Sequence, residues 1–281
     1  MKISAMTNAL RLPLTTTLDK YLAMGIQGVQ LVTTPEFLVM SDERIAEIRK
    51  EVEKRNMVIS AICGDIGRYR FTVTHEWQDR IAIHKRLSDI AIMLGTRIIT
   101  THIGVVADDA NDPTYPVMVE ALSNAAEYSK NNGTVFAIET GPECAETLVR
   151  LLDDVNSPGL GVNLDPANLR MVSCVEPDHA VEVLGKYIVH THAKDGINTY
   201  PGLAAATYGQ CNADGSRRTF TEKPATFKEV PLGQGQVNWD AYLAALKKIN
   251  YDGFFAIERE CGDDPEGDIR LAVDFLKSKN Y

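Results

Sequence analysis

Eight short apolar runs recur along the chain, and the segments between them have the periodicity of amphipathic helices. Through the first half the runs return roughly every 25–40 residues, as strands do in repeated strand–helix units. Runs that are apolar along their whole length are typical of a parallel sheet covered by helices on both faces. We predict strands at about 2–6, 28–32, 58–63, 97–102, 134–139, 160–165, 187–193 and 254–258.

This alternation predicts an α/β fold, the (β/α)8 TIM barrel, in which eight parallel strands close inside a ring of helices. A chain of 281 residues with 44% hydrophobic residues suits one such barrel, and we predict a single domain over 1–281. Barrels of this kind carry their functional groups at the C-terminal ends of the strands. We expect helices at about 16–24, 41–55, 76–94, 114–131, 145–153, 178–185 and 266–279, and one near Trp239.

The segment after the seventh strand interrupts this rhythm. Residues 196–236 are rich in Gly, Asn, Thr, Tyr and Pro. A loop of this length in a compact domain is usually functional or disordered. We expect a long loop over the barrel mouth that acts as a lid or as a contact between subunits. It closes with Pro231–Gly235, where the glycines allow the backbone to approach a ligand closely.

The seventh strand carries an unusual set of polar side chains. Because successive residues of a strand alternate between its faces, His190, His192 and Lys194 point the same way. Two imidazoles and an ammonium on one face would make a poor apolar core. The pattern is explained if this face opens into a polar pocket that holds a metal ion or an anion.

Three other predicted strands end in a carboxylate, at Glu139, Asp165 and Glu258. Glu139 lies 26 residues before Asp165, and Asp165 lies 27 before His192, which is one strand–helix unit each. The 66 residues from His192 to Glu258 are one unit plus the insertion. Each acid alone could be a salt-bridged or capping residue, but burying all these charges together without a partner would be too costly. We predict that they bind one divalent metal ion, for which carboxylate oxygen and imidazole nitrogen are suitable ligands.

Five short motifs fall at these strand ends and at the end of the insertion. They are Ile138-Glu139-Thr140, Asn163-Leu164-Asp165-Pro166-Ala167-Asn168, His190-Thr191-His192-Ala193-Lys194-Asp195, Pro231-Leu232-Gly233-Gln234-Gly235 and Ile257-Glu258. Their order resembles that of the sugar phosphate isomerase/epimerase family, in the xylose-isomerase-like TIM-barrel superfamily, and the resemblance covers the whole chain. It implies that the same four residues bind one divalent ion, often manganese, magnesium, cobalt or zinc. It also implies that Glu139 and Glu258 are the acid/base pair.

The implied chemistry is consistent with these residue types. Epimerising or isomerising a ketose requires removal of a proton from a carbon beside a carbonyl. A metal that holds the carbonyl and hydroxyl oxygens stabilises the enediolate that develops. Two carboxylates on opposite sides of the sugar can then exchange protons with it. The predicted partner is a small sugar or sugar phosphate, and the sequence does not name the sugar.

Further residues are expected to contact the substrate, namely His102, Glu143, Asn168, His190 and Lys194. His102 ends the fourth strand and could instead be structural. His190 lies deeper than His192 and could instead hydrogen-bond a ligand carboxylate. Glu143 is expected to start a helix, where an acid is favourable in itself, whereas Lys194 suits an oxyanion or an outer hydroxyl. The remaining histidines are expected to be solvated: His75, His84 and His179.

Charge and composition exclude other classes of protein. A formal charge of −9 argues against a nucleic-acid surface, which needs a basic patch. The five cysteines are scattered without a CxxC pair, which suits a reducing compartment. We find neither a leader pattern nor an apolar run long enough to span a bilayer. We therefore predict a cytoplasmic protein without membrane association, and a homo-oligomer stays open.

Three alternatives compete with the sugar isomerase or epimerase. A metal-dependent lyase, a dehydratase or a keto-glycoside-cleaving enzyme would use the same metal and acid/base pair after enolisation. Nucleases that resemble endonuclease IV use three zinc ions and need further histidines, one of them where this chain has Asn168, so a nuclease is disfavoured. A non-catalytic sugar-binding barrel has no need of two carboxylates poised on a metal and would tolerate Glu258→Gln.

Overall fold

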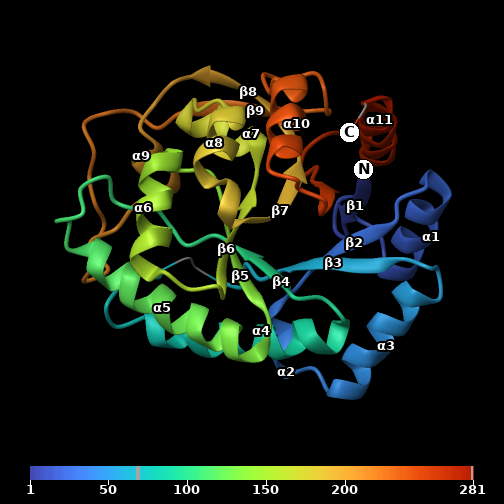
Figure 1. Cartoon of the computed structure of the whole chain (residues 1–281), viewed down its shortest axis with the longest axis horizontal. Coiled ribbons are helices and arrows are strands. Elements are labelled where there is room, and N and C mark those ends of the chain that lie inside the picture. Colours follow the sequence, from blue (N-terminus) through green and yellow to red (C-terminus); the bar gives the residue numbers. More distant parts are fainter. Residues whose placement is uncertain (68–69, 280) are drawn as a thin grey trace.

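The computed structural model describes residues 1–67, 70–279 and 281, and eight parallel strands close into a barrel at its centre (Figure 1). These strands are β1 (Lys2–Met6), β2 (Gly28–Val32), β3 (Val58–Cys63), β4 (Ile98–Thr101), β5 (Val135–Glu139), β6 (Leu160–Leu164), β7 (Ile188–Ala193) and β10 (Phe254–Ile257). Each strand pairs with the next one along the chain, and β10 pairs with both β7 and β1 to close the ring. The predicted (β/α)8 barrel is confirmed.

Helices surround the barrel on its outside (Figure 1). They are α1 (Leu14–Met24), α2 (Pro35–Val39), α3 (Asp42–Glu53), α4 (Trp77–Leu94), α5 (Thr114–Asn132), α6 (Ala145–Val155), α7 (Pro166–Asn168), α8 (Pro177–Leu184), α9 (Ala204–Tyr208), α10 (Trp239–Lys248) and α11 (Pro265–Ser278). A π-helical turn, Leu169–Ser173, and a 3-10 turn, Gly185–Tyr187, complete the helical segments. None of these described helices is both long enough and apolar enough to cross a membrane.

Local sequence signals explain where several helices begin and end. Ser41 caps α3 by accepting a hydrogen bond from the Arg44 amide, as small polar residues at this position do. Gly25 and Gly95 follow α1 and α4 with φ angles of 77° and 81°, in the left-handed region that only glycine adopts without strain. These ends turn the chain back toward the next strand and keep the strand–helix rhythm.

The insertion is not the long loop that the sequence predicts. It contains a two-stranded antiparallel sheet of β8 (Asp195–Tyr200) and β9 (Thr226–Val230), with the short helix α9 between them. Strand β8 starts two residues after β7 ends, so the hairpin extends directly from the barrel rim. Burial does not alternate along β9, which has exposed residues at 226–228 and buried ones at 229–230, so a period-two pattern does not predict this strand.

Asp195 anchors the insertion to the barrel. Its Oδ1 accepts hydrogen bonds from the amides of Gly196 at 2.9 Å and Val237 at 3.2 Å. Its Oδ2 accepts from the Gly233 amide and the Trp239 Nε1, both at 3.0 Å. All four donors face one buried carboxylate, so both ends of the insertion are held at the same point of the barrel rim.

The layer between barrel and helices is apolar, with one unexpected histidine. His84 of α4 is buried, with its ring centroid 4.8 Å from that of Phe136 in β5. Its Nε2 lies 2.7 Å from the hydroxyl of Ser129 in α5. The expectation that His84 is solvated is wrong, because this position of α4 faces the barrel, whereas the His75 and His179 side chains are more than half exposed.

Candidate metal centre

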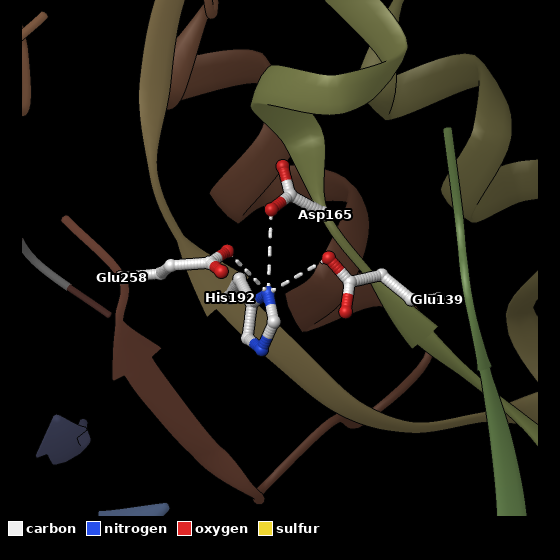
Figure 2. Close-up of side chains that lie close together, drawn as sticks. All are labelled: Glu139, Asp165, His192 and Glu258. Atoms are coloured by element: carbon white, nitrogen blue, oxygen red, sulfur yellow. Dashed lines mark hydrogen bonds and ion pairs between the residues drawn. The ribbon is translucent and has the colours of Figure 1, made fainter. Parts of the chain in front are cut away.

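Four side chains from consecutive barrel strands converge at the C-terminal end of the barrel (Figure 2). Measured from His192 Nδ1, the nearest carboxylate oxygens lie at 2.9 Å in Glu258, 3.2 Å in Asp165 and 3.5 Å in Glu139. One ligand atom from each residue lies within 4.8 Å of the others, and all four side chains are buried. The structure thus brings together the complete set of predicted metal ligands.

Strand register brings these groups to the same end of the barrel in a stagger of two residues, from Asn163 to Asp165 and from Ala256 to Glu258. Glu139 is opposite Asn163 in the β5–β6 pair, and His192 is opposite Ala256 in the β7–β10 pair. The carboxylates of Asp165 and Glu258 therefore follow directly on from paired strand ends. Asp165 also caps α7, because its Oδ1 accepts from the Asn168 amide at 2.8 Å. Its Oδ2 stays turned toward His192.

A hydrogen bond on the far side of the ring orients His192. Its Nε2 lies 3.0 Å from Gln30 Oε1, and the Gln30 amide nitrogen donates to Thr100 Oγ1 at 2.8 Å. Asn163 Nδ2 lies 3.1 Å from the same Nε2, so two side-chain amides hold this edge of the ring while Nδ1 faces the carboxylates. Metal-binding histidines usually have their second ring nitrogen hydrogen-bonded in a comparable way.

Electrostatics at the centre fit a bound cation. Burial lowers the pKa of His192, but the Glu258 and Glu139 carboxylates outweigh burial and raise that pKa well above its usual range. Burial raises the pKa of Asp165 to about 6. The Glu258 Oε2 is buried between two cationic groups, 2.9 Å from His192 Nδ1 and 3.2 Å from Lys194 Nζ. Three buried carboxylates and one imidazole fit a divalent metal ion.

Lys194 is the second basic side chain near Glu258, besides His192. Its Nζ lies 3.2 Å from Glu258 Oε2, 2.9 Å from Glu260 Oε2 and 3.9 Å from Glu229 Oε2. Burial raises the pKa of Glu258, but Lys194 and then His192 more than compensate and hold that pKa well below its usual range. Glu258 is therefore an ionised carboxylate.

His102 lies on the other side of the centre, beside Glu139. Its Nδ1 is 2.7 Å from Asp65 Oδ2, and its Nε2 is 3.7 Å from Glu139 Oε1. Burial lowers the pKa of His102, but Glu139 and Asp65 raise it to about 10. Asp65 Oδ1 also accepts from Thr101 Oγ1 and from the His102 amide, both at 2.8 Å. His102, held by Asp65, thus presents a protonated imidazole to Glu139.

The other predicted substrate contacts lie in three different environments. Asn168 donates from its side-chain amide to Glu139 Oε1 at 3.1 Å. His190 is buried behind His192, and its Nδ1 lies 2.9 Å from Asn163 Oδ1. Glu143 does not start a helix, because α6 begins two residues later. Glu143 is buried, which raises its pKa to about 8.

The centre opens into a cavity of about 740 Å³, a size typical of small-molecule sites. Barrel residues line it on one side, including Glu139, Lys194 and Glu258. The insertion lines the other side, including Tyr208 of α9 and Glu229 of β9. His102 and Tyr208 also line a neighbouring cavity of about 520 Å³.

Several residues that complete this site have little or no signal in the sequence. Asp65 and Gln30 orient His102 and His192, and each has a modest signal as a polar residue in or just after an apolar strand. Tyr208 and Glu229 have no such signal, because their place in the cavity depends on how the insertion folds back.

Comparison with known proteins agrees with this architecture. The model of the family described as "Xylose isomerase-like TIM barrel" matches residues 18–279, and the chain belongs to this family. An uncharacterised protein of Bacillus subtilis (strain 168), YfiH, is 25% identical over an alignment that covers 99% of this chain and 98% of that protein.

Solved structures share the fold. A xylose isomerase domain protein from Planctomyces limnophilus has a TM-score of 0.78 and 24% identity, covering 98% of this chain and 95% of that one. The probable 3-DHS dehydratase AsbF from Bacillus anthracis has a TM-score of 0.75 and 20% identity, covering all of both chains. A D-psicose 3-epimerase has a TM-score of 0.67 and 17% identity, covering 96% of this chain and 90% of that one.

Proposed function

We propose that this protein is a divalent-metal-dependent epimerase or isomerase that acts on a ketose or sugar phosphate by proton transfer through an enediolate. The observation that carries this proposal is that Glu139 and Glu258 flank His192 from opposite sides (Figure 2). Both carboxylates also line the same cavity. The D-psicose 3-epimerase among the structural neighbours supports the proposal at the level of the fold.

The donor set fits one divalent ion, held by Glu139, Asp165, His192 and Glu258. When bound, the ion would supply positive charge that stabilises the enediolate oxygens. Manganese, magnesium, cobalt and zinc all accept such ligands.

The two glutamates are the groups that remove and return the proton. Glu258, ionised beside Lys194, is suited to accept a proton from a carbon of a sugar in the cavity. Glu139 is hydrogen-bonded by Asn168 and lies beside the protonated His102, so it is held in place on the opposite side. Glu258 removes a proton from one side of the carbon and becomes protonated, and the acid form of Glu139 delivers its own proton to the other side, which inverts the carbon and is epimerisation.

A screen in deuterated water tests this function. Ketoses and ketose phosphates are incubated with the protein plus manganese, magnesium, cobalt or zinc, and products are identified by NMR. We expect at least one substrate to give an isomer or epimer with at least one of these four metals. We expect no turnover once the metal is removed by a chelator. If no member of the panel turns over with any metal, the proposal fails.

A dehydratase is the second candidate, and His102 is the observation that favours it. Its pKa of about 10 keeps the imidazole protonated, and it lines the cavity next to Glu139. A protonated imidazole can give a proton to a departing hydroxyl after the enediolate forms. AsbF, a probable 3-DHS dehydratase, has the same fold. The same screen detects this reaction, because the product would lose water and show a new conjugated carbonyl absorbance.

A further inference from the structure

Glu229 is a buried acid that the proposed mechanism leaves without a role. It lies on β9 of the insertion, opposite Gly196 of β8, and its side chain is only 6% exposed. A buried carboxylate is costly unless it is fully paired and hydrogen-bonded. Its contacts therefore indicate what it does.

One oxygen of Glu229 holds the chain that follows Glu258. Its Oε1 accepts from the amides of Glu260 at 3.0 Å and Cys261 at 3.2 Å, and from Arg259 Nη1. Arg259 is also held by Asp268 of α11 at 2.8 Å. Three donors from the segment next to Glu258 thus meet on a single oxygen of the insertion.

The other oxygen of Glu229 faces Lys194. Its Oε2 lies 3.9 Å from Lys194 Nζ, and the same Nζ lies 3.2 Å from Glu258 Oε2. Glu260 also pairs with Lys194, but its side chain is 62% exposed, so water screens that pair. Glu229 therefore adds a second buried carboxylate beside the Lys194 ammonium, at a longer distance than Glu258.

We propose that Glu229 is a positioning residue that fixes the Glu258 carboxylate from two directions, through the backbone after Glu258 and through Lys194. The insertion is then a working part of the active site, because it supplies the group that sets where the Glu258 base lies. This inference rests on the proposed function for the role of Glu258, but its first readout is metal affinity, which requires no turnover.

Two variants separate the two contacts. Glu229→Gln keeps an oxygen for the amides and Arg259 but places an uncharged amide N–H₂ beside Lys194. Glu229→Ala removes both contacts. Glu222→Gln is the matched control, since Glu222 is an exposed acid of the same insertion that bonds only its neighbour Thr221 among described contacts.

Metal affinity is measured first, by titrating each purified full-length variant with Mn²⁺ in a calorimeter. Loss of a group that orients a metal ligand typically weakens affinity ~10–100-fold. We expect about tenfold for Glu229→Gln, more for Glu229→Ala and no change for Glu222→Gln. Wild-type Mn²⁺ affinity in both Glu229 variants would overturn the inference. If Glu229→Ala does not fold by circular dichroism, Glu229→Gln alone decides.

Proton exchange then separates positioning of Glu258 from a general loss of structure. Each epimer of the best substrate is incubated separately in deuterated water. We expect Glu229→Gln to slow exchange about tenfold or more for the epimer whose proton Glu258 removes, and to leave the Glu139-side epimer nearly unchanged, with KM altered much less than kcat. Equal slowing of both epimers would overturn the inference.

Glu258→Gln provides the reference that keeps the two hypotheses apart. If Glu258→Gln slows one epimer selectively and Glu229→Gln does not, the positioning role is wrong and the proposed function stands. If Glu258→Gln has no selective effect either, the proposed acid/base role itself fails, whereas the Mn²⁺ titration still judges whether Glu229 positions Glu258 as a metal ligand.

Discussion

Individual histidines of this chain differ in charge because their surroundings differ. His192 and His102 face carboxylates, which raise the pKa of each imidazole despite burial. Among the described residues no carboxylate pairs with His84 or His190, and burial lowers the pKa of each to about 3. The carboxylates of the centre thus favour positive charge on the imidazoles beside them, whereas burial favours the neutral imidazole in the apolar layer and behind His192.

His84 makes the stability of the fold depend on pH. The folded state keeps His84 neutral down to about pH 3, whereas the unfolded chain binds a proton below about pH 6.5. Stability is therefore lost as the pH falls from 6.5 toward 3. Between pH 7 and pH 5 this single group should remove about 2 kcal/mol.

The measurement is urea unfolding at pH 7 and pH 5. We expect His84→Gln, whose amide can still bond Ser129, to lose about 2 kcal/mol less than wild type over this interval. His179→Gln is the control, because His179 is 51% exposed. An equal loss in wild type and His84→Gln would contradict the assignment.

Among the structural elements, the insertion is held at the barrel rim by one residue, Asp195. Asp195 accepts four hydrogen bonds, and Gly235 approaches so closely that an added Cβ would lie 2.0 Å from Asp195 Oδ1. The turn before α10 and the start of β8 are therefore locked together, which explains why glycine is required at 235.

Asp195→Asn should unlock this junction. The substitution turns an N–H₂ group toward two of the four donors and leaves them without an acceptor, at a cost of about 3 kcal/mol. For a chain of this size we expect the Tm to fall by roughly 6 °C. Asp240→Asn, on exposed α10 surface with its side chain 83% exposed, is the control. A Tm of Asp195→Asn within 1 °C of wild type, as measured by circular dichroism, would show that the junction matters little.

Elements with local signals were predictable from the sequence, and long-range ones were not. Continuous apolar runs fix the barrel strands, and Glu139 and Glu258 could be placed because they follow such runs. Glu229 could not, because its burial depends on β9 pairing back onto β8 across a segment of weak pattern. The burial of His84 is not predictable from the sequence, because a single polar residue on an amphipathic helix does not show whether it faces solvent or the barrel. The sequence thus predicts the metal ligands of the site, but not the network of residues that orients them.

At the scale of the whole molecule, three buried carboxylates lie close together at the C-terminal end of the barrel. Glu139, Asp165 and Glu258 all point at His192 (Figure 2), in a protein whose net charge is already −9. Repulsion among buried carboxylates opposes folding, so a bound divalent ion should stabilise the native state by mass action.

Metal binding should therefore raise thermal stability. At a Mn²⁺ concentration about 100 times the Kd, the expected gain is ~2.7 kcal/mol, or roughly 5–10 °C in Tm. His192→Ala and Asp165→Ala should show neither the shift nor more than about 0.1 equivalents of metal by elemental analysis, with circular dichroism unchanged. Full metal occupancy in both variants would mean that these residues are not the ligands.

Solvent deuterium at the reacting carbon tests the proton-transfer mechanism most directly. Wild type with its best ketose in deuterated water should give product that carries deuterium at that carbon. Glu139→Gln and Glu258→Gln keep the side-chain shape but cannot accept the proton. Each should therefore cut kcat at least about a hundredfold, with KM changed much less, and should slow solvent exchange of the proton that the replaced glutamate removes. Product without solvent deuterium would indicate a hydride shift, and full turnover by both metal-loaded variants would contradict the assignment of the acid/base pair.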